Sequence, residues 1–141
     1  MNFDNDCFYC VKDERLTNLM IEVCKLEAST LYLFKEQTYK GRCVVAYNDH
    51  KSEIFNLTDA ERSAFMGDVS RVAGAINKAF SPDKINYGAY ADTMTHLHFH
   101  IVPKYKGGPS FGATFEMSPK NKIFLKDEEY NQLINKIKEN L

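Results

Sequence analysis

Hydrophobic and polar positions alternate most regularly in residues 96–102, which read HLHFHIV. Successive side chains of a β-strand point to opposite faces of its sheet. The alternation therefore predicts a strand over 96–102, with its apolar residues turned toward a core and with His96, His98 and His100 together on the other face. Pro103 is expected to end this strand.

Four other segments are rich in β-branched and aromatic residues, which favour strands. They cover residues 20–25, 30–34, 42–47 and 85–90. Residues 111–117 are compatible with one further strand. The short link 26–29 has the length of a hairpin loop, and short links between strands predict antiparallel pairing.

The strongest helix signal begins at Thr58. Thr58 and Glu61 have the spacing of a capping box, in which each side chain bonds the backbone N–H of the other residue. Apolar residues then recur at helical spacing as far as Phe80, while polar residues such as Asp68 fall on the opposite face. We predict a helix over 58–80.

A second amphipathic pattern lies at the C-terminus. It starts with the acidic residues 127–129, and its apolar stripe runs to Leu141, which predicts another helix. Strands, a helix, strands and a helix thus follow one another along the chain, an order typical of the α+β class. We predict a five-stranded, mainly antiparallel sheet with helix 58–80 on one face, and a single domain over residues 1–141.

The charge balance limits the classes of partner. The chain has 141 residues, with 18 basic and 19 acidic side chains and a formal net charge of −1. This balance gives no electrostatic argument for binding to nucleic acid polymers or membranes, and we expect neither as a partner. No apolar run reaches the roughly 18 residues of a membrane span. The N-terminal residues lack the basic and apolar regions of a secretion signal, so we expect a cytoplasmic protein.

Cys7 and Cys10 form a Cys-x-x-Cys motif close to the N-terminus. Such a pair is typical of a metal knuckle or of a redox-active pair. A redox pair of the thioredoxin type would follow a strand, and no strand is predicted ahead of this motif. Together with His50 and one histidine of 96–102, the cysteines would make a Cys2His2 set, and zinc with four protein ligands is structural.

Three imidazoles on one face of a strand permit two kinds of chemistry. A His-x-His pair with a third ligand could hold a catalytic zinc ion that keeps a position open for water. Alternatively, one neutral imidazole could attack phosphorus while a protonated neighbour holds a phosphoryl oxygen. The residues alone leave both alternatives open.

The motif His-x-His-x-His-x-x, with apolar residues at each x, resembles that of the histidine triad superfamily of nucleotide hydrolases and transferases. The resemblance extends over residues 7–105 and includes the Cys-x-x-Cys motif, the capped helix, and Pro103 followed by a basic residue. It implies that His98 attacks the α-phosphorus of a nucleotide to form a nucleotidyl-histidine intermediate, and that His100 holds the phosphoryl oxygens. It further implies a histidine triad (HIT) fold, a homodimer and a purine nucleotide substrate.

The resemblance also assigns the remaining candidate residues. It implies a structural zinc ion on Cys7, Cys10, His50 and His96. It places the substrate near Arg42, Asn86, Asp92, Thr93 and Lys104. Arg42 stands where the family has a fourth histidine, and an arginine can bind phosphate but cannot shuttle a proton at neutral pH. This difference favours, as the alternative to an enzyme, a nucleotide-binding regulatory module with little turnover.

Overall fold

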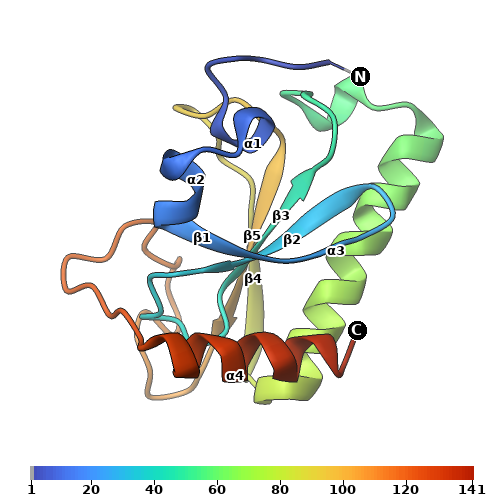
Figure 1. Ribbon diagram of the computed structural model, residues 1–141. Coiled ribbons are helices and arrows are strands. Elements are labelled where there is room, and N and C mark those ends of the chain that lie inside the picture. Colours follow the sequence, from blue (N-terminus) through green and yellow to red (C-terminus); the bar gives the residue numbers. More distant parts are fainter. Residues whose placement is uncertain (1) are drawn as a thin grey trace.

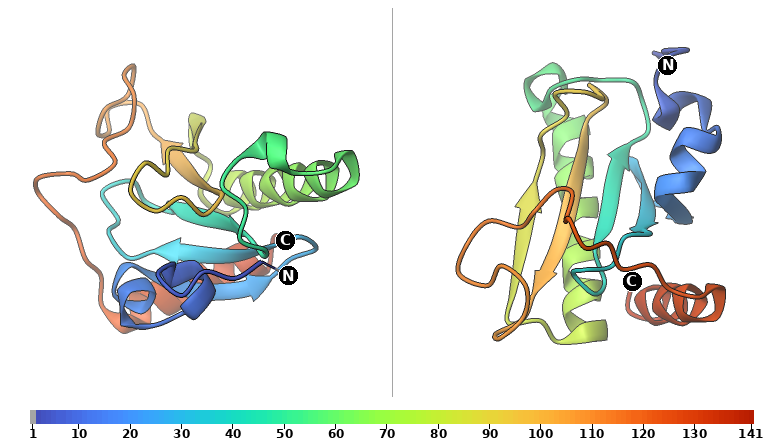
Figure 2. Two further views of the ribbon diagram at one scale, coloured as in Figure 1. Left: turned by 90° about the horizontal axis from the view of Figure 1, so that it is seen from above. Right: turned by 90° about the vertical axis from the view of Figure 1, so that its left-hand side faces the viewer.

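Residues 2–141, which the computed structural model describes, fold around one five-stranded sheet (Figures 1 and 2). The strands are β1 (Met20–Lys25), β2 (Ser29–Phe34), β3 (Cys43–Tyr47), β4 (Lys84–Gly88) and β5 (His98–Lys104). They lie in the order β1-β2-β3-β5-β4, and each strand is antiparallel to its neighbours. The predicted α+β class and antiparallel sheet are confirmed.

Helices pack on both faces of this sheet (Figure 2). They are α1 (Phe8–Val11), α2 (Glu14–Leu19), the 3-10 turn η1 (Ile54–Asn56), α3 (Asp59–Phe80) and α4 (Asp127–Lys138). On one face, α3 and α4 share the main core with inward residues such as Val45 and Phe65. On the other face, α1 and α2 pack residues such as Leu16 against Val44. Among residues 2–141, no helix is long and apolar enough to cross a membrane.

The long helix α3 begins and ends as its capping residues predict. The Thr58 hydroxyl accepts the N–H of Glu61, and the Glu61 carboxylate accepts the N–H of Thr58. After Phe80, Ser81 adopts the left-handed conformation and Pro82 follows, so the helix cannot continue. The capping box and the predicted helix over 58–80 are confirmed.

Asp68 is the exception to the predicted polar face of α3, because it is fully buried. Its carboxylate accepts hydrogen bonds from the backbone N–H groups of Glu27 and Ala28 and from the Ser29 hydroxyl, at 2.7 to 3.3 Å. A buried carboxylate needs such donors to offset its lost hydration. Asp68 therefore fixes the β1–β2 hairpin on α3.

The strand that carries the histidines is shifted relative to the prediction. It begins at His98, because the backbone of Leu97 bonds instead to Tyr47 and Lys51, at and beyond the end of β3. It also continues through Pro103, which pairs with β4 alone, since the pairing with β3 has already ended. A proline lacks a donor and is tolerated where a strand has no partner on one side.

Two other segments differ from the prediction. Residues 111–117 contain no strand and form part of an irregular segment between β5 and α4. Residues 8–19 hold the short helices α1 and α2, which no pattern indicated. The Asp13 carboxylate caps α2 by accepting the N–H of Arg15. Helices this short bury too few residues to produce a visible periodicity.

Candidate functional site

The pairing of β5 with β3 sets two histidines side by side on the sheet face opposite α3. His98 pairs with Ala46 and His100 with Val44, and the two imidazole centres lie 5.3 Å apart. Nδ1 of His98 lies 2.7 Å from the carbonyl oxygen of His96. A carbonyl only accepts, so this nitrogen carries the ring proton and donates it. Nε2 of His98 therefore keeps a free lone pair.

A pocket of about 570 Å³ opens in front of these two histidines. The loop after β4 forms its first wall, and the irregular segment after β5 forms its second wall. The lining residues of the two walls include Tyr90, Asp92, Thr93, Thr114, Phe115 and Met117. A pocket of this volume suits a small molecule of nucleotide size.

Arg42 lies behind His100 as a fully buried cation. Its guanidinium carbon lies 4.2 Å from the ring centre of Phe34 and 5.3 Å from that of Phe115. Nη2 donates to Nδ1 of His100 at 3.1 Å, and both Nη1 and Nη2 donate to the carbonyl of Met117 at 3.2 Å. Among the described residues, Arg42 Nε is the buried side-chain polar atom without a partner. Arg42 thus joins His100 to the second wall.

The contact with Arg42 fixes the protonation state of His100. A guanidinium only donates, so Nδ1 of His100 accepts and the ring proton resides on Nε2. Burial, and after it the charge of Arg42, lowers the pKa of His100 to about 3. At neutral pH His100 is therefore an uncharged N–H donor. A second cation beside the buried guanidinium is unfavourable, so His100 does not suit the role of the protonated neighbour in the phosphorus-attack alternative.

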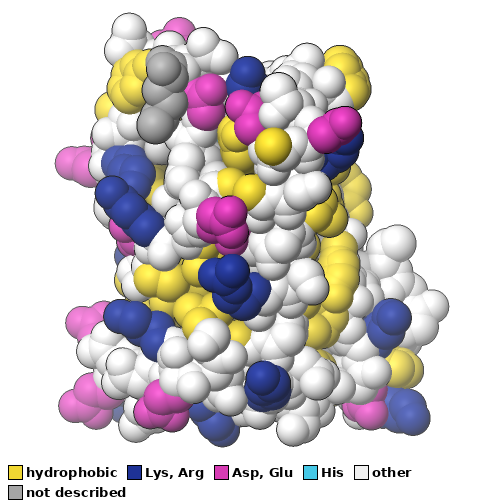
Figure 3. All heavy atoms as spheres, turned by 90° about the vertical axis from the view of Figure 1, so that its right-hand side faces the viewer, with side chains coloured by type: hydrophobic (Ala, Val, Ile, Leu, Met, Phe, Trp, Pro, Cys, Tyr) yellow, Lys and Arg dark blue, Asp and Glu magenta, His cyan; other side chains and the backbone are white. Residues whose placement is uncertain are grey.

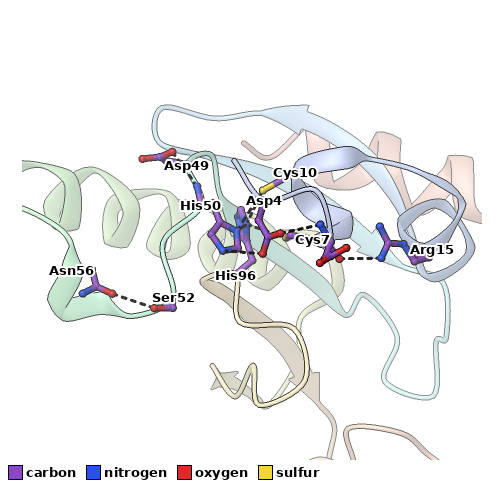
Figure 4. Close-up of polar contacts among 10 residues, drawn as sticks. Asp4, Cys7, Cys10, Arg15, Asp49, His50, Ser52, Asn56 and His96 are labelled. Atoms are coloured by element: carbon purple, nitrogen blue, oxygen red, sulfur yellow. Dashed lines mark hydrogen bonds and ion pairs between the residues drawn. The ribbon is translucent and has the colours of Figure 1, made fainter. Parts of the chain in front are cut away.

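The four predicted metal ligands come together at the N-terminal end of β5 (Figure 4). The ligand atoms of Cys7, Cys10, His50 and His96 all lie within 4.8 Å of one another. Nε2 of His96 donates to the carbonyl of Tyr47 at 2.6 Å, so its Nδ1 is left with a lone pair for the cluster. These residues could hold a metal ion.

The separations within the cluster fit a tetrahedral ion. With zinc bonds of about 2.3 Å to sulfur and about 2.0 Å to nitrogen, neighbouring ligand atoms lie roughly 3.3 to 3.8 Å apart. Cys7 Sγ lies 3.5 Å from His96 Nδ1, and Cys10 Sγ lies 3.4 Å from His50 Nδ1. The two Nδ1 atoms are 3.3 Å apart. The donor set therefore has both the chemistry and the spacing of a zinc site.

The surroundings of the cluster also favour ligation. Burial lowers the pKa of His96 to about 4, so the ring is neutral, as a metal ligand must be. The Asp4 carboxylate lies 3.6 Å from Nε2 of His50, the ring nitrogen that does not contact Cys10 (Figure 4). A carboxylate in that place orients the imidazole and raises its basicity.

Tyr9 links the metal cluster to the pocket histidines. It stands between the two cysteines in the sequence, and it is buried. Its ring centre lies 5.1 Å from that of His96 and 5.0 Å from that of His98. The Cys-x-x-Cys turn thus places an aromatic side chain against both imidazoles, which restricts their rotation.

The residues predicted to bind substrate do not form a single group. Asp92 and Thr93 line the pocket, whereas Arg42 lies behind its floor. Lys104 is buried on β5 and donates to the carbonyl of Ala113 at 2.7 Å and to Asn86 Oδ1 at 3.4 Å. Lys104 therefore connects β4 and β5 to the segment that carries the second wall.

Sequence reasoning missed Tyr9 and several residues around the pocket. Gly88 pairs with His100, and a Cβ at Gly88 would lie 2.6 Å from the Tyr90 ring and 2.9 Å from the Phe115 ring. A glycine inside a strand signals such a close approach. Phe115 belongs to an irregular segment without periodicity, so no sequence pattern marked it.

Comparison with known sequences places this chain among related proteins. Residues 12–107, more than half of the chain, match the HIT domain family. Protein hit of Bacillus subtilis is 30% identical over 90 residues, which are 60% of this chain and 62% of that protein. The chain thus spans less than two thirds of the Bacillus protein. An uncharacterized HIT-like protein of Mycoplasma genitalium is 27% identical over 143 residues and 97% of each chain.

Solved structures share the fold. A histidine triad (HIT) protein of Sinorhizobium meliloti has a TM-score of 0.83 and 24% identity, over 92% of this chain and 95% of that one. A Hit-like protein of Bartonella henselae, described as involved in cell-cycle regulation, has a TM-score of 0.75 and 20% identity over 100% of both chains. Identities this low establish the fold alone.

The metal cluster makes a first prediction. We expect the purified protein to hold about one metal ion per chain, and Cys7→Ser to lose it, because three remaining ligands bind more weakly than four. Cys24→Ser is the matched control, since Cys24 is a free thiol outside the cluster. Elemental analysis measures the ion, and a chelator should lower the Tm of the wild type by at least roughly 5 °C. An ion that survives Cys7→Ser would contradict the assignment.

The second prediction concerns the charge of His100. A histidine in the unfolded chain titrates near its ordinary value of about 6.5, whereas in the folded protein the pKa of His100 is about 3. The unfolded chain therefore binds more protons in this range, so the contribution of His100 to stability decreases as the pH falls from about 6.5 toward 3. Nitrogen-15 NMR of the ring should show an accepting Nδ1 and a protonated Nε2 down to about pH 5. Protonation near pH 6.5 would contradict this account.

Proposed function

Because the chain belongs to the HIT domain family, we propose that it is a nucleotide hydrolase or nucleotidyl transferase that acts at an α-phosphate through a covalent nucleotidyl-histidine intermediate. The observation that carries the proposal is the free Nε2 of His98, beside a pocket of about 570 Å³. The bond from Nδ1 to the carbonyl of His96 holds the ring in the tautomer that attacks. A neutral imidazole with a fixed lone pair is a suitable nucleophile for phosphorus.

The reaction then consists of two displacements at phosphorus. In the first, Nε2 of His98 forms a P–N bond while the bond to the leaving group breaks and its electron pair departs with that group. In the second, water or another acceptor attacks the phosphorus, and the P–N electron pair returns to Nε2. The His96 carbonyl accepts from Nδ1 throughout, which stabilises the positive charge that the ring gains on attack.

His100 and the first wall hold the phosphoryl group in this proposal. The Nε2–H of His100 donates to a non-bridging oxygen, and the Thr93 hydroxyl is a second donor on the pocket surface. The charge of Arg42, transmitted through the hydrogen bond to His100, strengthens the donor that faces the phosphate. Asp92 lies in the same wall, where a carboxylate accepts hydrogen bonds from ribose or base.

For the metal cluster, we propose a structural zinc ion held by Cys7, Cys10, His50 and His96. Two thiolates and two imidazoles fill a tetrahedral shell, and a reducing compartment such as the cytoplasm keeps the thiols available. The bound ion ties the N-terminal segment to the start of β5. The alternative of a catalytic zinc on a His-x-His pair is less well supported, because Nδ1 of His96 turns to the cysteines while His98 lines the pocket.

A nucleotide-binding regulatory module with little turnover is the second candidate function. The observation that favours it is Arg42, which is a fixed cation where the family has a proton-shuttling histidine. A fixed cation near the phosphate site strengthens the binding of an anion without helping it to leave. Calorimetry that shows tight binding of AMP or GMP, together with no turnover of a nucleotide panel, would support this candidate.

A homodimer is the proposed assembly. β4 is an edge strand of the sheet, and an unpaired edge presents free backbone donors and acceptors. Next to it, Met66 and Tyr87 are exposed and surround a shallow pocket together with Phe99. Figure 3 shows apolar side chains between charged ones on the side of the molecule that carries α3. Pairing of two β4 edges would cover these groups.

The central prediction is that His98→Ala loses turnover but keeps nucleotide binding. Removal of the attacking nitrogen should lower kcat by at least about 10³-fold on dinucleoside polyphosphates and nucleoside phosphoramidates. Calorimetry with a nucleoside monophosphate measures binding, and metal content and Tm serve as controls for the fold. Turnover at the wild-type rate in His98→Ala would refute the nucleophile.

Dimerisation gives a separate prediction. Light scattering at micromolar concentration should return about twice the 16.2 kDa of the chain. Tyr87→Lys should shift the protein toward the monomer, because it places a cation at the edge strand. Lys84→Arg, at the exposed start of the same strand, is the control that keeps the charge. A mass near 16.2 kDa for the wild type would reject the dimer.

A further inference from the structure

The floor of the pocket combines a permanent cation with a histidine that is held neutral. Burial lowers the pKa of Arg42 only to about 10, so the guanidinium stays charged at neutral pH. It occupies Nδ1 of His100, and the single ring proton of His100 is on Nε2. A neutral imidazole is a far weaker acid than an imidazolium, so His100 can hold an oxygen but cannot protonate a leaving group.

The other titratable groups at the pocket do not replace that missing acid. Among the described residues, those that line the pocket with the two histidines are Tyr90 and Asp92. Both are exposed on the loop after β4. His98 is the attacking group, and its ring proton is bonded to the carbonyl of His96. The buried floor therefore offers charge stabilisation and a nucleophile, but no transferable proton.

Building on the proposed function, we propose that this site selects nucleotides by their leaving group: it accepts groups that depart unprotonated, above all the phosphates of phosphoanhydrides, and disfavours amines and alcohols. Arg42 is a positioning residue: it occupies Nδ1 of His100 and supplies no transferable proton, whereas a histidine at the same position could supply one. Arg42 reaches the substrate only through His100 and through the second wall, which it anchors at the Met117 carbonyl.

The chemistry of the first displacement explains the preference. As His98 Nε2 bonds to the α-phosphorus, the P–O bond of an anhydride breaks and its electron pair leaves on a phosphate oxygen. A phosphate monoester dianion is a stable leaving group, since its last pKa is about 6. An amine must instead take up a proton as the P–N bond breaks, because it would otherwise have to leave as an amide anion, which is a far stronger base than a phosphate. Because the floor of the pocket, among the described residues, holds no group that can donate a proton, departure of an amine is slow.

The test is a leaving-group series on the metal-loaded wild-type protein. The substrates are phenyl esters of one nucleoside 5′-monophosphate, with phenols of graded acidity. We expect kcat/KM to fall roughly tenfold for each unit by which the phenol pKa rises, as for unprotonated departure. The phosphoramidate of the same nucleoside should react at least about 10²-fold more slowly than its diphosphate. A flat series, or a phosphoramidate as fast as the diphosphate, overturns the inference.

Two substitutions at one position separate the proton from the charge. Arg42→His and Arg42→Gln both remove the guanidinium and keep a donor near His100, but only the histidine can carry a transferable proton at neutral pH. We expect the dependence of kcat/KM on the phenol pKa to become weaker in Arg42→His and to stay steep in Arg42→Gln. Tm and metal content serve as controls for the fold. If Arg42→His does not fold, the wild-type series still decides.

Two further variants test whether Tyr90 or Asp92 donates a proton to the leaving group, and His98→Ala tests the reaction itself. Suppose that kcat/KM of the wild type depends only weakly on the phenol pKa, and that the dependence becomes steep in Tyr90→Phe or in Asp92→Asn. The substituted residue would then be the acid, and the inference would be overturned. If turnover is lost in His98→Ala, but kcat/KM of the wild type does not change with the phenol pKa, only the leaving-group preference is rejected. Turnover that survives His98→Ala rejects the nucleotidyl-histidine reaction itself and the preference with it.

Discussion

The site depends on the hydrogen bond from Nδ1 of His98 to the carbonyl oxygen of His96, 2.7 Å away. Together with the bond from Nε2 of His96 to the carbonyl of Tyr47, it gives two neighbouring imidazoles opposite tautomers. His96 turns Nδ1 toward the cysteines, whereas His98 keeps Nε2 free in the pocket. Tyr9, between the cysteines, packs on both rings. Order imposed at the Cys7, Cys10, His50 and His96 cluster would therefore reach Nε2 of His98 through one peptide unit and one aromatic ring, so a bound ion would bear on the proposed chemistry.

Arg42 shows how a buried charge shapes the other half of the site. A buried cation is costly unless it is paired, and its observed partners are an imidazole, a carbonyl and two aromatic faces rather than a carboxylate. This arrangement favours an anion beyond His100 and opposes protonation of His100. The same guanidinium anchors the second wall at Met117, so the shape of the pocket and its electrostatics depend on one residue.

Periodicity and capping were enough to predict most of the sheet and both long helices. The Cys-x-x-Cys motif with His50 indicated three members of the cluster that could hold a metal ion, and the fourth, His96, came from the family resemblance. The buried position of Asp68 could not be predicted, because its partners are backbone donors that only the folded hairpin brings together. The buried contact of Lys104 with the Ala113 carbonyl could not be predicted either, because Ala113 lies on a segment without periodicity. The same is true of Met117. Local patterns predict elements, whereas these contacts depend on irregular segments.

Detection of a covalent nucleotidyl group on His98 would test the proposed reaction most directly. The protein would be mixed with a dinucleoside polyphosphate, quenched within milliseconds under alkaline conditions that preserve phosphoramidate bonds, and digested for mass spectrometry. We expect one nucleoside monophosphate unit on the peptide that contains residues 96–102, localised to His98 by fragmentation and absent when the substrate is omitted. Turnover without any adduct on this peptide, or an adduct on His96 or His100 instead, would contradict the proposed reaction.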